Sequence, residues 1–316
     1  MSSRTHITFL VHPLSRRRLL IGAAAALPVL YAGAEPAVRE HSSAADKIAA
    51  LEAKLGGRIG VAALDTENGR RIDHRTAELF PLCSTFKLLL AAFILARVDS
   101  GRETLIRRIA YSRSDLLTYA PITTKHIDEG EMTVEALCAA AIQYSDNTAA
   151  NLLLASSGGP DALTQYLRSL GDTVTRLDRI EPELNNAVEG DPRDTTSPSA
   201  MLASMQRILL GDALSVAART RLQQWLDGNT TGDARLRAGM PKGWRVGDKT
   251  GTGENGASND VAIVFPSSPQ PGAPSRKPWL ITAYCTGSTA SFAERNTALA
   301  EIGRIVAAQF SISRYT

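Results

Sequence analysis

The chain has 316 residues, enough for one large domain or two lobes with a substantial core. Its 35 basic and 32 acidic side chains give a formal charge of +3, but Arg4, Arg16, Arg17 and Arg18 lie in the first 34 residues, which contain no acid. The remaining 31 basic and 32 acidic side chains are balanced, which gives no electrostatic basis for binding nucleic acid or an anionic membrane.

The first 34 residues have the pattern of an export leader. Three arginines after Ser15 precede an Ala- and Leu-rich run at 21–31 that is too short to span a bilayer, and Ala32-Gly33-Ala34 forms a small-x-small cleavage site. We therefore expect a signal peptide at 1–34 and a periplasmic mature protein at 35–316, without a lipid or membrane anchor. The paired arginines fit a twin-arginine signal and an ordinary secretory leader equally well.

The cysteine and histidine content argues against several classes of site. Cys83, Cys138 and Cys285 are too few and too far apart for a disulfide framework or a zinc knuckle. Three histidines follow the leader, and none forms an H-x-x-x-H or H-x-H pattern. A metal site or a Ser-His-Asp triad therefore has little to build on, and we expect neither a metal nor a cofactor.

The hydrophobic patterns predict strands at both ends of the mature chain and helices between them. In chain order, the predicted elements are a flexible start at 35–43, a helix at 44–55, strands at 58–65 and 71–74 around the turn signal Glu67-Asn68-Gly69, a helical block at 83–225, strands at 244–250, 257–265 and 279–285 with a surface loop at 267–277, and a closing helix at 291–310.

This arrangement indicates an α+β fold. The sheet is antiparallel, is built from the N- and C-terminal segments and has flanking helices, and the helical block forms a second, all-helical lobe. We place the α/β lobe at about 44–82 and 227–316 and the all-α lobe at about 83–226. The active site is expected in the cleft between them.

The first candidate for chemistry is Ser84-Thr85-Phe86-Lys87, directly ahead of the apolar run at 88–96. If that run is a helix, the hydroxyl and the ammonium lie on one face, about one turn apart. A lysine in low dielectric can lose its charge and take the proton of a serine, and unpaired N–H groups of the first turn favour negative charge on a reacting oxygen. The pattern suits acyl transfer, although alone it is also typical of a helix cap beside a surface lysine.

Three further segments follow in order: Ser145-Asp146-Asn147, then Arg179 to Asn185 running on to Asp194-Thr195-Thr196, then Lys249-Thr250-Gly251. Together with Ser84 and Lys87 the first and last resemble the serine penicillin-recognising enzymes, and the middle segment resembles the omega loop of class A β-lactamases. The similarity covers residues 44–312. It implies hydrolysis of the lactam amide of penicillins and cephalosporins through a serine acyl-enzyme, conferring β-lactam resistance, by a protein that we expect to be a monomer.

The resemblance also implies catalytic roles. Ser84 would be the acylated nucleophile, and its own N–H with that of Thr252 would form the oxyanion hole. Lys87 would move protons to and from Ser84, and Ser145 would pass a proton to the leaving lactam nitrogen. Glu181 would activate the water that hydrolyses the acyl-enzyme. Whether Lys87 or Glu181 starts acylation stays open.

Two other sets of residues follow from the same resemblance. Arg179 and Asp194 would tie the neck of the omega loop, Asn151 would brace it, and the Glu181–Pro182 bond is a candidate for the cis form. Residues implied to bind the substrate or the hydrolytic water are Tyr119 at the cleft mouth, Asn147, Asn185, Arg235, Lys249, Thr250 and Gly251.

The family's extra arginine for the substrate carboxylate stands in some members on the strand after Lys-Thr-Gly. Here that position is Ser258, and Arg235 stands where another subgroup supplies the arginine. The alternative for Arg235 is a surface charge at a helix end.

The sequence departs from the family at two disulfides. Cys138 has Ala91 at its partner position, and Cys83 has Gly253, so neither bridge should form. The absence of the second bridge argues against strong carbapenem hydrolysis.

Two alternative functions remain. A D,D-peptidase or penicillin-binding protein shares the first three signatures, but lacks the loop that Glu181 and Asn185 represent. A non-catalytic β-lactam sensor domain is the alternative from a different class, and the leader without a transmembrane segment argues against it.

Overall fold

The computed structural model describes residues 43–267 and 276–312. The predicted leader, nearly all of the expected flexible start and most of the predicted loop at 267–277 lie outside these residues. Ser43 caps the first helix, because its hydroxyl accepts the N–H of Asp46 while the Asp46 carboxylate accepts the N–H of Ser43. Ser291 and Glu294 form the same capping box at the last helix, which explains why both predicted terminal helices begin where they do.

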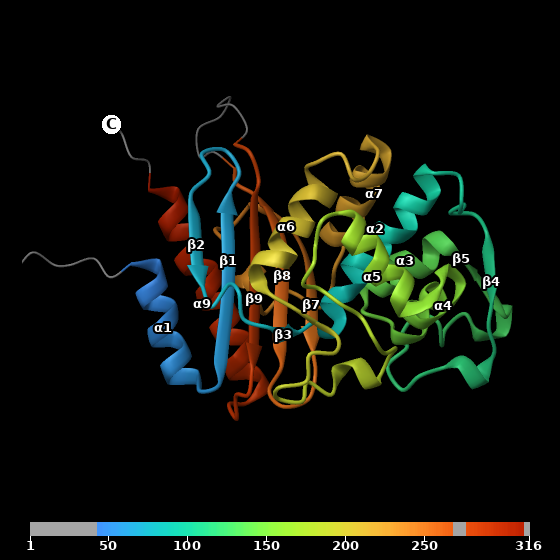
Figure 1. The fold of residues 1–316 in the computed structure, drawn as a ribbon, viewed down its shortest axis with the longest axis horizontal. Coiled ribbons are helices and arrows are strands. Elements are labelled where there is room, and N and C mark those ends of the chain that lie inside the picture. Colours follow the sequence, from blue (N-terminus) through green and yellow to red (C-terminus); the bar gives the residue numbers. More distant parts are fainter. Residues whose placement is uncertain (1–42, 268–275, 313–316) are drawn as a thin grey trace, which may run out of the picture. The chain divides into compact units, whose positions relative to one another are not determined.

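Five strands form an antiparallel sheet in the order β2-β1-β9-β8-β7 (Figure 1). Their bounds are β1 (Arg58–Asp65), β2 (Arg71–His74), β7 (Arg245–Thr252), β8 (Ser258–Phe265) and β9 (Trp279–Thr286). Val61 of β1 lies opposite Ala283 of β9, so the two ends of the chain meet inside the sheet. The prediction of an α+β fold with this sheet is confirmed, and each strand lies within two residues of its predicted bounds.

Both faces of the sheet are buried, so its strands show almost no polar alternation. Val61 and Ala63 point into a core shared with α1 (Ala44–Leu55) and α9 (Phe292–Ser311), whereas Ala62 and Leu64 point into the core on the other face. In Figure 1, α1 and α9 lie at the β2 end of the molecule and the other large helices lie toward the β7 end.

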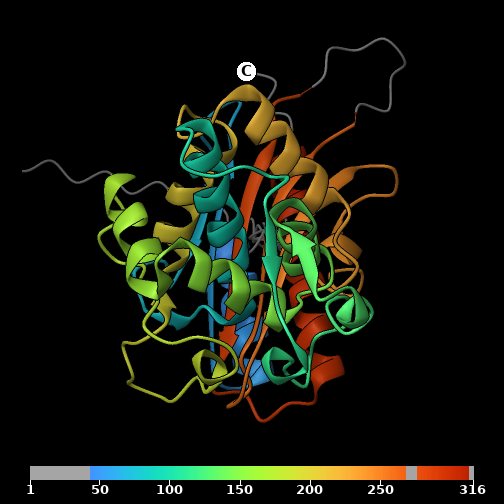
Figure 2. The same cartoon turned by 90° about the vertical axis from the view of Figure 1, so that its right-hand side faces the viewer.

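The second face of the sheet is covered by α6 and by a group of helices around α2. These helices are α2 (Phe86–Asp99), α3 (Val134–Gln143), α4 (Asn147–Ser157), α5 (Gly159–Ser169), α6 (Pro198–Leu209) and α7 (Val216–Asp227). Every residue of α2 from Phe86 to Leu95 is buried, because α3, α4, α5 and α7 surround it. Figure 2 shows these helices in front of the sheet.

The predicted helical block at 83–225 is only partly right. Two short strands, β4 (Arg108–Ala110) and β5 (Glu131–Thr133), pair inside it, and β6 (Thr195–Thr196) pairs with β3 (Phe80–Pro81). The segment between α5 and α6 is mostly irregular, since its prolines and its polar turns interrupt helical hydrogen bonding. Within the described residues, no helix is both long enough and apolar enough to cross a membrane.

Candidate active site

Ser84 lies in the short 3-10 turn η1 (Cys83–Thr85), directly ahead of α2. Its side chain is nearly buried, and Lys87 in the first turn of α2 donates from Nζ to Ser84 Oγ at 3.0 Å. Cys83 has a φ of +43°, a conformation that is uncommon for a residue other than glycine and that marks a sharp turn before the serine. The predicted pairing of hydroxyl and ammonium on one face of a helix start is confirmed.

Lys87 holds the centre of a buried polar cluster. Its Nζ donates to Asn147 Oδ1 at 2.6 Å and to Ser145 O at 2.9 Å, and it lies 2.9 Å from Glu181 Oε1. Both partners of the ion pair are fully buried. Burial lowers the pKa of Lys87, while the Glu181 carboxylate opposes that shift. The Lys87 ammonium can therefore exchange a proton with Ser84 or with Glu181.

Ser145 lies between two buried lysines. Lys249 Nζ donates to Ser145 Oγ at 3.1 Å, and Lys87 Nζ lies 3.4 Å from the same oxygen. Burial holds the pKa of Lys249 well below its usual value, and the charge of Lys87 lowers it further. Asp146 fixes this turn, because its buried carboxylate caps α4 and accepts two backbone N–H groups from the loop at 122–123. The Ser145 hydroxyl thus has proton donors on two sides.

Glu181 enters the site from the omega loop, which we define as residues 179–194. Its side chain is fully buried, and Oε1 lies 3.4 Å from Ser84 Oγ. Asn185 in the 3-10 turn η4 (Glu183–Asn185) donates to the other carboxylate oxygen. Asn151 of α4 braces the backbone, since its side chain donates to Glu181 O at 2.9 Å and accepts Glu181 N at 3.0 Å. The Glu181–Pro182 bond is cis, as the resemblance suggested.

The neck of the omega loop is closed by Asp194. This fully buried carboxylate accepts Arg179 Nε at 2.5 Å and the backbone N–H groups of Asp178 and Arg179 at 2.7 and 2.9 Å. The backbone N–H of Asp194 donates to Asp178 Oδ2 at 3.0 Å. The predicted Arg179–Asp194 pair is confirmed, and the two backbone contacts show that Asp194 sets the chain path as well as the charge balance.

Strand β7 runs past the nucleophile turn at van der Waals distance. A Cβ on Gly251 would lie 2.9 Å from Leu82 O and 3.1 Å from Cys83 Cβ, which explains why the Lys-Thr-Gly sequence needs glycine here. Thr250 Oγ1 lies 2.5 Å from Thr231 Oγ1, and Thr252 is exposed at the end of the strand.

Arg235 is not a surface charge, so that alternative is wrong. It is 3% exposed and precedes α8 (Leu236–Gly239). Its Nη1 donates to Gly251 O at 2.8 Å and to Asn259 O at 2.7 Å, and its Nη2 donates to Thr252 Oγ1 at 2.7 Å. A guanidinium has five N–H donors, and with Nε bonded to Asn296 one N–H on Nη2 remains.

Sequence reasoning missed the contribution of α9 to this corner. Asn296 accepts Arg235 Nε at 2.9 Å, and the Phe292 ring lies 5.6 Å from the Arg235 guanidinium carbon. Ser258, the position at which other members of the family carry the extra arginine, accepts Arg295 Nε at 2.9 Å. No local pattern signals these contacts, because they join segments about 40 to 60 residues apart.

The remaining predicted residues lie around the cluster. Asn147 begins α4 and points its amide oxygen at Lys87, and its N–H donates to Tyr119 O at 3.0 Å. Tyr119 is 52% exposed, which is compatible with a place at the rim.

The three cysteines are free and buried. Burial raises the pKa of Cys83 to about 12, although this thiol adjoins the nucleophile. Residues 43–267 and 276–312 contain no group of three or more His, Cys, Asp or Glu side chains that could hold a metal ion.

Comparison with known proteins places the chain in a family. The model of the β-lactamase enzyme family matches residues 43–310. β-Lactamase L2 of Stenotrophomonas maltophilia is 47% identical over 303 residues, covering 92% of this chain and 98% of that protein, and β-lactamase Toho-1 of Escherichia coli is 44% identical over 292 residues, covering 92% and 97%.

Solved structures agree with the sequence relatives. An ancestral class A β-lactamase, termed GNCA, has a TM-score of 0.81 and 57% identity, covering 85% of this chain and 100% of that one. The putative class A β-lactamase PenP of Rhodopseudomonas palustris has a TM-score of 0.80 and 55% identity, covering 84% and 99%. The chain therefore belongs to the β-lactamase enzyme family and, within it, to class A.

Proposed function

We propose that this protein hydrolyses the β-lactam amide bond of penicillins and cephalosporins through an acyl-enzyme on Ser84, and thereby confers resistance to them. The observation that carries the proposal is that the start of α2 and the omega loop meet at one hydroxyl, with Ser145 beside them. Lys87 Nζ at 3.0 Å and Glu181 Oε1 at 3.4 Å flank Ser84 Oγ, and Ser145 bridges Lys87 to Lys249. A serine with two proton acceptors in reach and a proton donor on the far side has the groups that acyl transfer requires.

Acylation begins with attack of Ser84 Oγ on the lactam carbonyl, while the serine proton passes to Lys87 or Glu181. The N–H groups of Ser84 and Thr252 stabilise the charge that develops on the carbonyl oxygen. Ser145 then gives its proton to the lactam nitrogen as the C–N bond breaks. The proton taken from Ser84 passes through Lys87, whose Nζ lies 3.4 Å from Ser145 Oγ, and restores the Ser145 hydroxyl.

Deacylation requires a water beside the ester. Glu181 is the carboxylate placed to take a proton from it, and Asn185 donates to the second oxygen of that carboxylate. The same pair argues against a penicillin-binding protein, in which the ester would persist.

Substrate recognition is proposed to centre on β7. Lys249, Thr250 and the remaining N–H of Arg235 would hold the substrate's carboxylate, with Gly251 allowing the close approach of the strand. Asn147 would contact the amide side chain of the substrate and Tyr119 would wall the opening.

A chromogenic cephalosporin tests the proposal. The purified mature protein should hydrolyse it with multiple turnovers, and Ser84→Gly should abolish turnover. A single stoichiometric burst without turnover would identify a penicillin-binding protein or a sensor, and no reaction at all would exclude all three β-lactam-binding functions.

We further infer that the active site lies where an α/β lobe at about 44–82 and 227–316 meets an all-α lobe at about 83–226. The nucleophile turn, α4 and the omega loop belong to the all-α lobe, and β7 belongs to the α/β lobe. Limited proteolysis should release no stable fragment with cuts near 82 and 227 if the two lobes form one folding unit.

The leader supports export to the periplasm, and the absence of a cysteine within residues 1–34 supports a mature protein without a lipid anchor. The resemblance to class A β-lactamases supports a monomer. Cell fractionation with N-terminal sequencing should find Glu35 as the first residue of a periplasmic protein. Arg16→Lys with Arg17→Lys should block export if the twin-arginine route is used and leave it unchanged if the general secretory route is used. Light scattering of the purified protein checks the monomer.

A further inference from the structure

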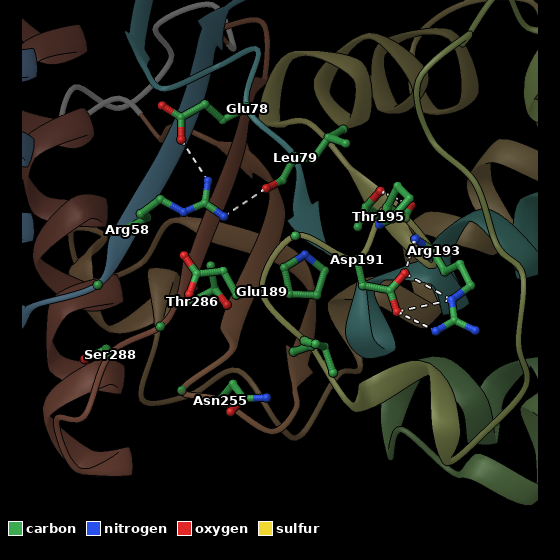
Figure 3. A pocket seen from close by; sticks show the side chains of 18 of the residues that line it. Arg58, Glu78, Leu79, Glu189, Asp191, Arg193, Thr195, Asn255, Thr286 and Ser288 are labelled. Atoms are coloured by element: carbon green, nitrogen blue, oxygen red, sulfur yellow. Dashed lines mark hydrogen bonds and ion pairs between the residues drawn. The ribbon is translucent and has the colours of Figure 1, made fainter.

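A cavity of about 790 Å³ lies apart from the catalytic cluster. None of Ser84, Lys87, Ser145 or Glu181 lines it. Its walls are the omega-loop residues 187–193, the start of β1, the end of β9 with the following residues, the segment 78–81, and the turn between β7 and β8 (Figure 3). The volume is in the range of pockets that hold small organic ligands, about 300 to 1,000 Å³.

Among the charged side chains that line this cavity, one carboxylate has no partner. Each lining arginine has a carboxylate partner: Arg58 with Glu78 at 2.8 Å, Arg193 with Asp191 at 2.8 Å, and Arg179 with Asp194 at 2.5 Å. Glu189 has no hydrogen bond or ion pair to any residue within 43–267 and 276–312. Figure 3 shows Glu189 beside Thr286, between the omega loop and the end of β9.

The cavity also exposes large apolar side chains. Leu79 is 41% exposed and Val188 is 54% exposed, and both line the cavity with Pro81 and Leu184. A wall that combines exposed apolar side chains with one unpaired carboxylate and no unpaired lining cation is complementary to a ligand with an apolar body and a positive end.

We propose that this cavity is a second binding site, for small organic cations of the aryl-alkylamine class. The ammonium pairs with Glu189, and the aromatic body packs on Leu79 and Val188. The site goes beyond the hydrolytic function, because no residue of the catalytic cluster lines it.

The cavity nevertheless adjoins the segment that carries Asn185. Leu184, which lines the cavity, lies between Glu183 and Asn185 in η4. The opposite wall is tied to the same segment, since Asn255 Nδ2 donates to Asn186 O at 2.9 Å. A bound amine therefore sits behind the loop rather than in the substrate's place, and any effect on hydrolysis should be non-competitive with the lactam.

Phenethylamine is the probe for the test, with 2-phenylethanol as its neutral counterpart, and binding is followed by amide chemical shifts of the ¹⁵N-labelled mature protein. The amine should shift amides in 187–193 and 286–289, and it should bind at least three-fold more tightly than the alcohol, since a partly exposed ion pair contributes modestly. Glu189→Gln should weaken the amine three- to ten-fold. Glu183→Gln removes the same charge from the same loop without lining the cavity, and should leave the affinity unchanged.

Three results would overturn the proposal: equal affinity of the amine for wild type and Glu189→Gln, equal losses in Glu189→Gln and Glu183→Gln, or competitive inhibition of hydrolysis with shifts confined to the catalytic segments. Hydrolysis of the chromogenic cephalosporin by the same samples shows separately whether the enzymatic function holds, so failure of the cavity site and failure of that function are told apart.

Discussion

Replacement of Asp194 by asparagine should loosen the omega loop and slow deacylation more than acylation. In the wild type one carboxylate oxygen accepts the backbone N–H groups of Asp178 and Arg179, and the other accepts Arg179 Nε at 2.5 Å. Asparagine can keep the first set of contacts with its single oxygen. Its NH₂ group then faces another donor, and the largely buried Arg179 keeps only the more distant carboxylate of Asp191, 3.8 Å from its Nη2.

The size of the effect follows from these contacts. A hydrogen bond to a charged group contributes about 1.5–3 kcal/mol, and removing one partner of a buried pair costs about 3–5 kcal/mol. The Arg179 side chain keeps 19% exposure, so we expect a loss of about 2–4 kcal/mol in the free energy of unfolding. For a chain of this size that is a fall in Tm of roughly 4–8 °C.

Thermal unfolding and single-turnover kinetics measure the two effects. Asp212→Asn, an exposed acid in the loop before α7 with no partner in the described structure, is the matched control and should leave Tm unchanged. The reasoning is refuted if Asp194→Asn has the wild-type Tm, or if it slows acylation and deacylation equally.

Three further outcomes are expected. Arg235→Ala should lower kcat/KM for penicillins, with a loss of about 1–3 kcal/mol in transition-state stabilisation, the range of a charge-assisted hydrogen bond. The substitution removes both the free N–H and the support of Thr252, and an unchanged kcat/KM would limit Arg235 to a packing role. Lys87→Met should cost about 3 kcal/mol or more in urea unfolding by leaving Glu181 buried without its cation, and Lys87→Met with Glu181→Gln should recover most of that loss; additive losses would show that the 2.9 Å pair is not coupled. Thiol titration should find almost no reactive cysteine in the native protein and three in urea, because all three are buried and free; fewer than three in urea would reveal a disulfide.

The fold was largely predictable because the sheet strands carry strong local signals. The turn at Glu67-Asn68-Gly69 and the apolar runs of β8 and β9 identify strands without knowledge of their partners. The helical block was less predictable. Strands β4 and β5 have three residues each, too few for a periodic pattern, and they form only because the fold brings them together.

For the candidate site, the sequence motifs predicted which residues meet, and the structure supplied the contacts that no motif contains. Ser84 and Lys87 could be paired from their spacing, since one helical turn fixes their distance. Phe292 and Asn296 could not be paired with Arg235, because that contact depends on where α9 packs across the sheet. The exposure of Arg235 was likewise a tertiary property that its neighbours in sequence do not encode.

Intact mass spectrometry of the Glu181→Ala protein after brief mixing with a penicillin tests the central claim most directly. Ser84 retains Lys87 and Ser145 within reach in this variant, so the acyl-enzyme should still form. Without a carboxylate to deprotonate the water, a contribution of typically ~10²- to 10⁴-fold in rate, the adduct should persist, and a Ser84→Gly control should show none. Near-normal turnover by Glu181→Ala with no accumulated adduct would contradict the account, because deacylation would then not depend on Glu181.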